Sequence, residues 1–445
     1  MRTELILRHG DRMIPRYTSY PTAPHFHAGV DDRTYAEWLQ QVPVDQPVSL
    51  YLHVPFCQAM CWYCGCNTRV TRRSEPVETY IGLLRDEMNL VAAELPGRMT
   101  VRHLHWGGGS PSIMTPEQLC WTTDMIAQTF DLPDDAEQAM ELDPRNLTPE
   151  LVAAMALCGI NRASLGVQTF DPDVQAAIGR VQPYDLVREA TKRLRGTGIS
   201  DINMDLLYGL PKQTTNTVRR TAEQVLTLMP RRISVFGYAH VPGMKAHQRL
   251  IDADILPDSH ERLSQFEAIA EMLTDAGYVA IGLDHFAHPD DEMAMAHHQG
   301  DLQRNFQGYT TDQAPVLIGV GASAIGSLPQ GYVQNAPDNA RWQLAIRDGR
   351  LPTVRGRELT TGDRMRREII ERVMCDLRVD PVAIAARHGL PVPEVDLTDL
   401  ERDGIIRRDG DMISLLPEFR PLARVVAAAF DAFLDHGIAR HSIAV

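Results

Sequence analysis

The chain has 445 residues, and its 44 Lys and Arg against 58 Asp and Glu give a formal net charge of −14. A hydrophobic share of 44% and a charged share of 23% are typical of a globular protein and exclude extensive disorder. The negative charge argues against a nucleic-acid or anionic-membrane partner, and no apolar run approaches the roughly 20 residues that span a bilayer. Because the start of the chain has no signal-peptide core, we expect a cytoplasmic protein, and nothing in the sequence requires more than a monomer.

A regular alternation of strands and helices follows an irregular start that holds one predicted helix, at residues 31–41. Residues 78–95, for example, place Tyr80, Leu84 and Met88 on one face at helical spacing. Consecutive βα units predict an α/β fold with a full or partial (β/α) barrel, and an open doubly wound sheet is the alternative. The predicted strands span residues 48–54, 101–106, 138–142, 162–167, 202–207 and 233–238.

The last hundred residues change to short helices and a hairpin, a pattern similar to a winged-helix module. The Asp409-Gly410 pair favours a type I′ hairpin turn. Because this segment is not strongly basic, we expect a structural or lid role rather than DNA binding. The predicted helices span residues 364–377, 381–387, 396–403 and 419–434, and the hairpin strands span 405–408 and 412–415.

Four cysteines lie close together directly after the first predicted strand: Cys57, Cys61, Cys64 and Cys66. The first three have the spacing C-x3-C-x2-C. Thiolates on one compact loop can bind three irons of a [4Fe-4S] cluster and leave the fourth iron open for another ligand. Structural zinc is disfavoured, because zinc sites use cysteine pairs separated by a longer insert.

A run of three glycines, Gly107 to Gly109, ends the second predicted strand and precedes Ser110 and Pro111. The run does not match the G-x-G-x-x-G pattern of dinucleotide-binding loops. Glycines permit either a tight turn or a close approach of the backbone to a ligand, to which the backbone would offer bare N–H and C=O groups. Next to the cysteine loop, the second interpretation is favoured.

Together, the cysteine loop and the Gly-Gly-Gly-Ser-Pro segment resemble the radical S-adenosylmethionine superfamily. Further segments are similar to the family of oxygen-independent coproporphyrinogen III oxidases, and the resemblance covers almost the whole chain. These segments are residues 16–22, 64–67, 166–168, 205–211, 238–240 and 304–309.

The resemblance implies a radical S-adenosylmethionine oxidoreductase with a [4Fe-4S] cluster on Cys57, Cys61 and Cys64. The implied reaction is the anaerobic oxidative decarboxylation of two propionates of coproporphyrinogen III to vinyl groups, which gives protoporphyrinogen IX in haem biosynthesis. An electron donor and an electron acceptor are required, and the sequence identifies neither. The implied parts are an N-terminal extension over the active site (1–45), a barrel (46–340) and a small, mostly helical winged-helix-like domain (341–445).

The resemblance also implies two bound S-adenosylmethionine molecules. The cluster-bound molecule would contact Tyr51, Gly108, Glu141 and Ile325. The second would contact Tyr63, Gly109, Ser110, Gln168, Arg180, Asp205 and Ala239. Carboxylates such as Glu141 and Asp205 suit ribose hydroxyls, and Arg180 suits a carboxylate, although ordinary ion pairs are the alternative. Cys66 and Tyr51 are the candidate catalytic residues.

The implied substrate has four carboxylates, so we expect a local basic pocket, with Arg16 and Arg304 as candidates. A radical-S-adenosylmethionine-like haem chaperone, which carries haem, is the main alternative, and an oxygen-sensing DNA-binding protein is a distant one. The His and Asp residues between 285 and 298 lack the H-E-x-x-H spacing, so a second metal is disfavoured, and we expect a polar loop that faces the active site.

Overall fold

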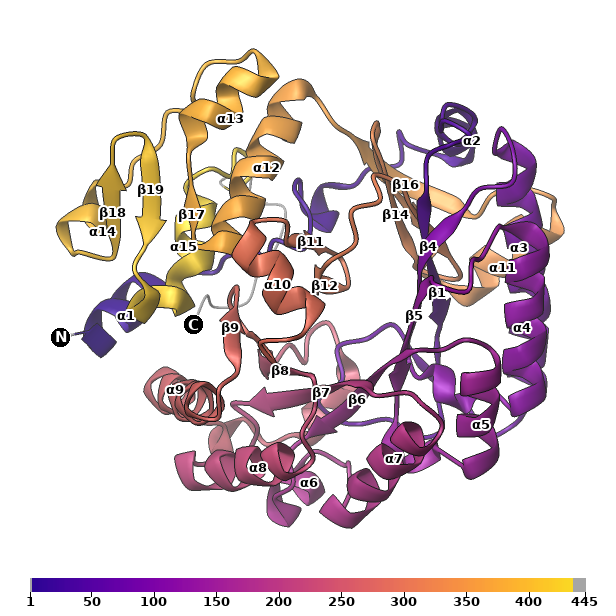
Figure 1. The fold of residues 1–445 in the computed structure, drawn as a ribbon, viewed down its shortest axis with the longest axis horizontal. Helices are drawn as coiled ribbons and strands as arrows, with labels where there is room; N and C mark the ends of the chain where they lie inside the picture. The colour runs from indigo at the N-terminus through magenta and orange to yellow at the C-terminus, as the bar shows by residue number, and fades with distance from the viewer. Residues whose placement is uncertain (1, 435–445) are drawn as a thin grey trace.

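One large curved sheet organises the computed structural model, which describes residues 2–434 (Figure 1). Its 12 strands follow the order β16-β15-β14-β13-β1-β4-β5-β6-β7-β8-β10-β9. Strands β13 to β8 run parallel, and the pairs at both ends are antiparallel. The parallel strands are β13 (Leu317–Val320), β1 (Val48–Val54), β4 (Val101–Gly108), β5 (Glu137–Leu142), β6 (Arg162–Gln168), β7 (Asp201–Tyr208) and β8 (Arg232–Gly237). The flanking strands are β14 (Ile325–Leu328), β15 (Gly331–Asn335), β16 (Thr353–Glu358), β10 (His285–Ala287) and β9 (Val279–Ile281).

Each predicted parallel strand is present, within two residues of its predicted ends. The barrel is partial, because the end strands β16 and β9 do not pair with each other. The connecting helices lie on the convex outer face, so the doubly wound alternative is not found (Figure 1). They are α3 (Glu75–Glu94), α4 (Pro116–Thr129), α5 (Pro149–Leu157), α6 (Pro172–Ala177), α7 (Tyr184–Gly196), α8 (Thr215–Thr227) and α9 (Ser259–Asp275).

Helix α3 shows how the outer layer is held to the sheet. On its predicted inner face, Tyr80, Leu84 and Met88 are 0% exposed and belong to the main hydrophobic core. The Tyr80 hydroxyl donates to the carbonyl of His53 at 2.8 Å and accepts from the amide of Ala322 at 2.8 Å. The helix is therefore fastened to the C-terminal ends of β1 and β13, where the site lies. Truncation of a side chain such as Leu84 to Ala would cost about 2–5 kcal/mol.

A buried carboxylate on α3, Glu87, was not expected from the sequence. It is 1% exposed and accepts hydrogen bonds from the Gly321 amide at 2.8 Å, Asn335 Nδ2 at 2.6 Å and Trp342 Nε1 at 2.8 Å. Burial raises its pKa to about 8, although these three donors act in the opposite direction. Trp342 lies on α11 (Asn339–Arg347), so one carboxylate ties three segments together.

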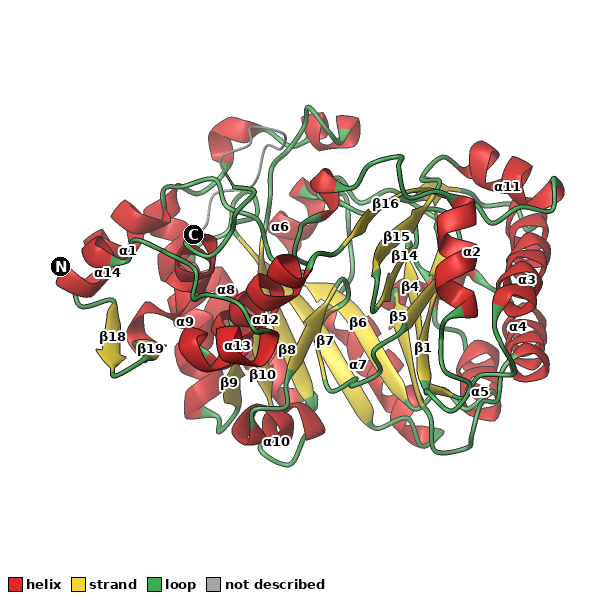
Figure 2. Cartoon of the chain, turned by 90° about the horizontal axis from the view of Figure 1, so that it is seen from above, coloured by secondary structure: helices red, strands yellow, loops and turns green. Residues whose placement is uncertain are grey.

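The C-terminal part has its own hydrophobic core and lies on the opposite side of the sheet from α3 and α4 (Figure 2). The expected winged arrangement is present, with a small sheet in the order β17-β19-β18. Its elements are α12 (Thr361–Asp376), β17 (Arg378–Val379), α13 (Pro381–His388), α14 (Thr398–Arg402), β18 (Ile406–Asp409) and β19 (Met412–Leu415). Strand β16, at 353–358, still belongs to the large sheet, and the division of the chain at residues 45 and 340 stays a prediction.

Two local predictions in this part are wrong. The expected helix at 419–434 is instead a 3₁₀ helix over Pro417–Leu422 followed by the short helix α15 (Ala423–Ala428), because Pro421 has no amide to donate. Residues 435–445 lie outside the described part. In the hairpin, Asp409 pairs with Met412, and only Gly410 of the two loop residues has positive φ, at 58°. This is the pattern of a type II′ turn rather than type I′.

The N-terminal extension holds two helices, α1 (Arg2–Gly10) and the predicted α2 (Asp32–Gln40). Ile6 of α1 is 0% exposed within the C-terminal core, together with Ile14, Tyr17 and Tyr20. The start of the chain therefore packs on its end, a contact that sequence periodicity could not reveal. Among residues 2–434, no helix is both long enough and apolar enough to cross a bilayer.

Candidate active site

The cysteine loop begins where β1 ends. Strand β2 (Phe56–Cys57) pairs with β3 (Arg69–Val70), so that the intervening residues close into a compact loop. Cys61 is buried, Cys57 and Cys64 are half-buried, and Cys66 is exposed. The predicted cluster ligands therefore lie inside the loop, and Cys66 lies at its surface.

Each of the three predicted ligand sulfurs receives hydrogen bonds. Thr68 Oγ1 donates to Cys57 Sγ at 3.3 Å, and the Cys66 amide donates to Cys64 Sγ at 3.4 Å. The Cys66 side chain and amide lower the pKa of Cys64 to about 6, whereas burial raises that of Cys57 to about 11. Hydrogen bonds to sulfur are a main means by which proteins tune iron–sulfur clusters.

Cys61 receives the strongest donors, two arginines. Arg180 Nη1 lies 3.3 Å from its Sγ and Arg145 Nη2 lies 3.5 Å from it. Asp143 forms ion pairs with both guanidinium groups, at 2.6 Å from Arg145 and at 3.3 Å from Arg180. Sequence reasoning missed Asp143 and Arg145, although both follow the end of a predicted strand, where barrel sites lie.

A [4Fe-4S] cluster fits this loop. Within the described residues, no three His, Cys, Asp or Glu side chains are placed to hold a single metal ion. That is consistent with thiolates that each bind a different iron and so need not converge on one point. The soft sulfur donors and the cationic groups around them suit an iron–sulfur cluster better than a hard cation.

The three glycines of the Gly-Gly-Gly-Ser-Pro segment are required by the protein's own packing. A Cβ on Gly109 would lie 2.4 Å from Thr68 Oγ1 and 2.7 Å from the carbonyl of Phe56. Gly108 has φ of 115°, and a Cβ there would lie 2.8 Å from the His53 ring. The amides of Gly109 and Ser110 donate to the carbonyls of Val54 and Phe56, each at 2.9 Å. The expectation of bare amides for a ligand is therefore wrong for these two groups.

Predicted contacts for the cluster-bound S-adenosylmethionine meet at the ends of β1, β4 and β5. Glu141 Oε2 accepts the Gly108 amide at 3.2 Å, and its Oε1 bonds to His105 Nε2 at 3.2 Å. Burial raises the pKa of Glu141, but the bond from His105 and the nearby charge lower it overall. The Tyr51 hydroxyl bonds to His53 Nδ1 at 3.0 Å. This network presents one anionic carboxylate, 43% exposed, beside the cysteine loop.

Ile325 stands two strands away from Tyr51. Tyr51 pairs with Gly319 of β13, and a Cβ on Gly319 would lie 2.6 Å from the Ile325 carbonyl. The absence of a side chain at Gly319 thus lets Ile325 of β14 approach β13 next to Tyr51.

Predicted contacts for the second S-adenosylmethionine fall into two groups. Tyr63, Gln168, Asp205 and Ala239 line one cavity of about 480 Å³, together with Arg16. Burial raises the pKa of Asp205, which accepts bonds from Ser164 and Asn203. Gln168 has φ of 68°, an unusual backbone angle at the end of β6.

The other group, which consists of Gly109, Ser110 and Arg180, makes hydrogen bonds within the protein. Ser110 is 4% exposed, and its hydroxyl bonds to Ser112 Oγ at 2.6 Å and accepts the Asp143 amide at 3.2 Å. Arg180, 6% exposed, donates to the Gly166 carbonyl at 2.7 Å besides Cys61 and Asp143. Its charged neighbours hold its pKa above the usual value despite burial. The positions of Gly109, Ser110 and Arg180 therefore favour support of the cysteine loop, and direct ligand contact stays a prediction.

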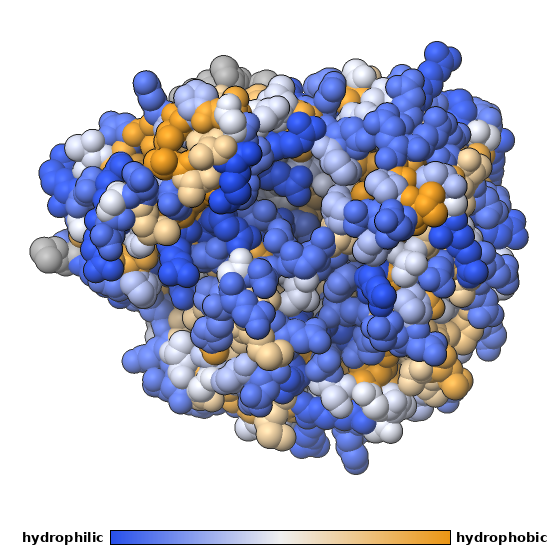
Figure 3. Space-filling view, turned by 45° about the horizontal axis from the view of Figure 1, so that its top comes forward, coloured by the Kyte–Doolittle hydropathy of each residue, from blue (hydrophilic) through white to orange (hydrophobic). Residues whose placement is uncertain are grey.

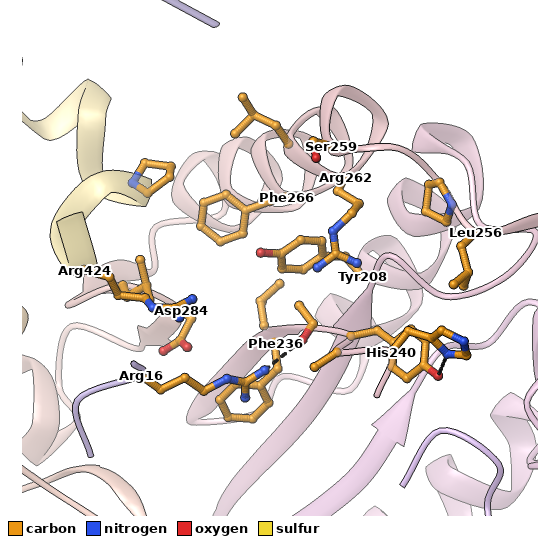
Figure 4. A pocket seen from close by; sticks show the side chains of 18 of the residues that line it. Arg16, Tyr208, Phe236, His240, Leu256, Ser259, Arg262, Phe266, Asp284 and Arg424 are labelled. Carbon is orange, nitrogen blue, oxygen red and sulfur yellow. Dashed lines mark hydrogen bonds between the residues drawn. The ribbon is translucent and has the colours of Figure 1, made fainter. Parts of the chain in front are cut away.

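A larger cavity of about 610 Å³ adjoins the first (Figure 4). Phe236, Gly237, Tyr238 and Ala239 at the end of β8 form a wall common to both. The face of the molecule that Figure 3 presents is hollowed, and hydrophilic side chains surround the hollow. Four arginines and two aspartates line the larger cavity, so it is locally cationic in an acidic protein: Arg16, Arg262, Arg304, Arg424, Asp258 and Asp284.

Both predicted substrate residues line this cavity, in different ways. Arg16 is exposed and donates to the Gly237 carbonyl at 3.3 Å. Arg304, on β11 (Gln303–Asn305), donates to the carbonyls of Tyr17 at 3.1 Å and Arg16 at 3.2 Å, and stacks on Tyr309 with its Cζ 4.3 Å from the ring centroid. Arg304 therefore holds the segment that carries Arg16.

The His and Asp residues between 285 and 298 do not form one polar loop. His285 is on β10 and bonds to Asp284 at 2.8 Å, and Asp291 caps α10 (Glu292–Gln299) while pairing with Arg232 at 2.7 Å. The expectation of a polar loop is wrong, because the segment is split between a strand and a helix.

The fold and the cysteine loop define a radical S-adenosylmethionine protein, since residues 51–225 match the model of the Radical SAM superfamily. The class works with a [4Fe-4S] cluster and S-adenosylmethionine. The chain is 51% identical over 451 residues to the oxygen-independent coproporphyrinogen III oxidase of Bradyrhizobium diazoefficiens, covering 100% of both chains. The chain belongs to the family of oxygen-independent coproporphyrinogen III oxidases.

Two further relatives agree. The enzyme of the same name from Paracoccus denitrificans is 40% identical over 98% of this chain and 97% of its own. The structure of coproporphyrinogen III oxidase from Escherichia coli, described as a radical SAM enzyme, matches with a TM-score of 0.89 at 34% identity. The match covers 95% of this chain and 100% of the Escherichia coli chain. The haem-chaperone alternative is not favoured by these matches.

Proposed function

We propose that this chain catalyses the oxygen-independent oxidative decarboxylation of two propionates of coproporphyrinogen III to vinyl groups. The single observation that carries the proposal is that the cavity of about 480 Å³, lined by Tyr63 and Gly65 of the cysteine loop, shares a wall with the locally cationic cavity of about 610 Å³. A pocket of that volume suits a small organic ligand, and its arginines suit a polycarboxylate. Membership of the oxidase family supports the same reading.

Cys57, Cys61 and Cys64 would hold the cluster, and Glu141 and Asp205 would bind hydroxyl groups of the two S-adenosylmethionine molecules. When bound, the cluster and S-adenosylmethionine would supply the one-electron chemistry needed to remove one hydrogen atom from a propionate. The propionate then loses carbon dioxide and one electron to an acceptor and becomes a vinyl group. The reaction therefore requires an electron donor as well as that electron acceptor.

The residues of this chain orient the reactants and shield them. Tyr51 is held by His53 and stacks on His105, with ring centroids 5.8 Å apart, so it forms a fixed wall beside Glu141. Cys66 is exposed at the surface of the cysteine loop, and in this proposal it faces the reacting substrate rather than binding iron. Residues 14–16 line the smaller cavity, and Arg16 lines both; in this proposal the segment shields the reacting groups from water. We also propose that the enzyme works in the cytoplasm as a monomer.

The experiment is an anaerobic turnover assay on the full chain with a reconstituted cluster. Coproporphyrinogen III, S-adenosylmethionine, a reductant and an electron acceptor are supplied, and porphyrins and 5′-deoxyadenosine are separated by chromatography. Protoporphyrin after oxidation, together with 5′-deoxyadenosine, supports the proposal. Haem binding without any vinyl product would overturn it in favour of a haem carrier, and a salt-dependent DNA shift would favour a sensor.

A further inference from the structure

The larger cavity contains an arginine whose charged group contacts an aromatic ring rather than a carboxylate or a carbonyl. Arg262, on α9, makes no hydrogen bond or ion pair through its guanidinium with any residue of the described part of the chain. It contacts the Tyr208 ring, with its Cζ 5.5 Å from the centroid, and is half-buried in the cavity wall. A half-buried cation without a hydrogen-bond or ion-pair partner is favourable only if an anion or water bonds to it.

The surrounding backbone makes room for this side chain. A Cβ on Gly209 would lie 2.1 Å from Arg262 Nη1, and a Cβ on Gly237 would lie 3.1 Å from its Nη2. Gly209 has φ of 78°, which other residues rarely adopt. Two backbone positions without side chains therefore flank the guanidinium and leave space for it against the Tyr208 ring.

The other three arginines of the cavity are already engaged with backbone carbonyls. Arg424 donates to Pro15 at 2.9 Å and also to Ile14, Arg304 donates to Tyr17 and Arg16, and Arg16 donates to Gly237. Burial and the nearby Arg16 lower the pKa of Arg424 to about 10, which reflects crowding of positive charge. A bound anion would relieve that repulsion.

We propose that Arg262 binds a propionate carboxylate of the tetrapyrrole substrate, with Tyr208, Phe236 and Phe266 forming apolar walls for the macrocycle. Figure 4 shows Arg262 beside Tyr208 and across the cavity from Arg16, Arg424 and Asp284, so carboxylates on opposite edges of one ring could meet cations on both sides. The shared wall at Gly237 to Ala239 joins this cavity to the one lined by the predicted cofactor contacts. This inference rests on the proposed function.

The test measures binding of coproporphyrin III, the unreactive oxidised form of the substrate, to the cluster-loaded full chain by fluorescence quenching. R262Q removes the charge, R262K keeps it without the planar fork, and R188Q is the matched control. Arg188 is 60% exposed on α7 and pairs with Asp185, so its loss changes net charge equally. The tetramethyl ester of coproporphyrin III serves as the uncharged probe.

We expect R262Q to weaken binding of the acid about 10-fold or more and to raise KM similarly, with R262K intermediate and R188Q unchanged. Binding of the ester should not differ between R262Q and wild type. Unchanged affinity of R262Q for the acid, or equal weakening for acid and ester, would overturn the assignment. Should R262Q fail to fold, wild-type affinity in R262K would overturn it as well. Formation of vinyl product by wild type is measured in parallel. If wild type forms no vinyl product, the proposed function is wrong. If wild type turns over normally and R262Q binds the acid with wild-type affinity, only the Arg262 assignment is wrong.

Discussion

Arg180 and Asp143 form a buried ion pair directly beside the cysteine loop. Arg180 Nη1 lies 3.3 Å from Asp143 Oδ2 and 3.3 Å from Cys61 Sγ, so one guanidinium bridges a carboxylate and a predicted cluster ligand. Asp143 and Arg180 are 7% and 6% exposed. The pair therefore fixes the position of the sulfur and keeps a positive charge next to it.

Asp143→Ala should destabilise the folded protein by about 3–5 kcal/mol, because it leaves the Arg180 charge buried without its carboxylate. The measurement is urea unfolding of the purified chain. Arg188→Ala is the control, since Arg188 is 60% exposed, pairs with Asp185 at the surface and should change stability by about 1 kcal/mol or less. Equal effects of the two variants would contradict the role given to Asp143.

Cys66→Ser should retain the cluster but lower turnover, because Cys66 is exposed beside the loop rather than enclosed in it. Iron content and the visible absorption spectrum report the cluster, and vinyl product reports turnover. Cys57→Ser is the comparison, and there the cluster itself should be lost. A normal turnover rate in Cys66→Ser would contradict the prediction.

Gly109→Ala should impair cluster assembly, because its Cβ would collide with Thr68 Oγ1 and the Phe56 carbonyl and displace the loop. Gly82→Ala, in the middle of α3, meets no atom within 4 Å and should stabilise the protein by about 0.5–1 kcal/mol. Iron content and thermal unfolding of both variants separate the two effects. Full iron loading of Gly109→Ala would show that the loop accommodates the methyl group.

Glu87 should make stability depend on pH. Its pKa is raised from 4.5 to about 8 in the folded state, so the folded protein binds more protons than the unfolded one between these values. Its contribution is therefore fully present below about pH 4.5 and is lost as pH rises through about 8. Glu87→Gln should remove this part of the slope in urea unfolding between pH 5 and 9. A slope equal to that of wild type would exclude Glu87 as its source.

The parallel strands could be predicted because each is a short apolar run bounded by turn residues, and the cysteine loop because its spacing is itself the chemical signal. Ile6 shows what could not be predicted, because its neighbours in the C-terminal core, Met365 to Phe430, lie more than 350 residues further along the chain. Glu87 and Asp143 were missed for a similar reason. A carboxylate in a helix or a strand end looks like a surface residue until the fold supplies its donors.

Arg304 of the barrel and Arg424 of the C-terminal part both donate to backbone carbonyls at residues 14–17. Ile14 and Pro15 of this segment line the smaller cavity, and Arg16 lines both cavities. Ligand binding in the cavities and docking of the C-terminal part therefore both depend on this segment. By thermodynamic reciprocity, a ligand that stabilises this segment must also stabilise the C-terminal helices against local opening. The docking of those helices must raise the affinity for the ligand by the same free energy. Hydrogen exchange in α12 and α15 would then report events in a cavity that neither helix encloses by itself.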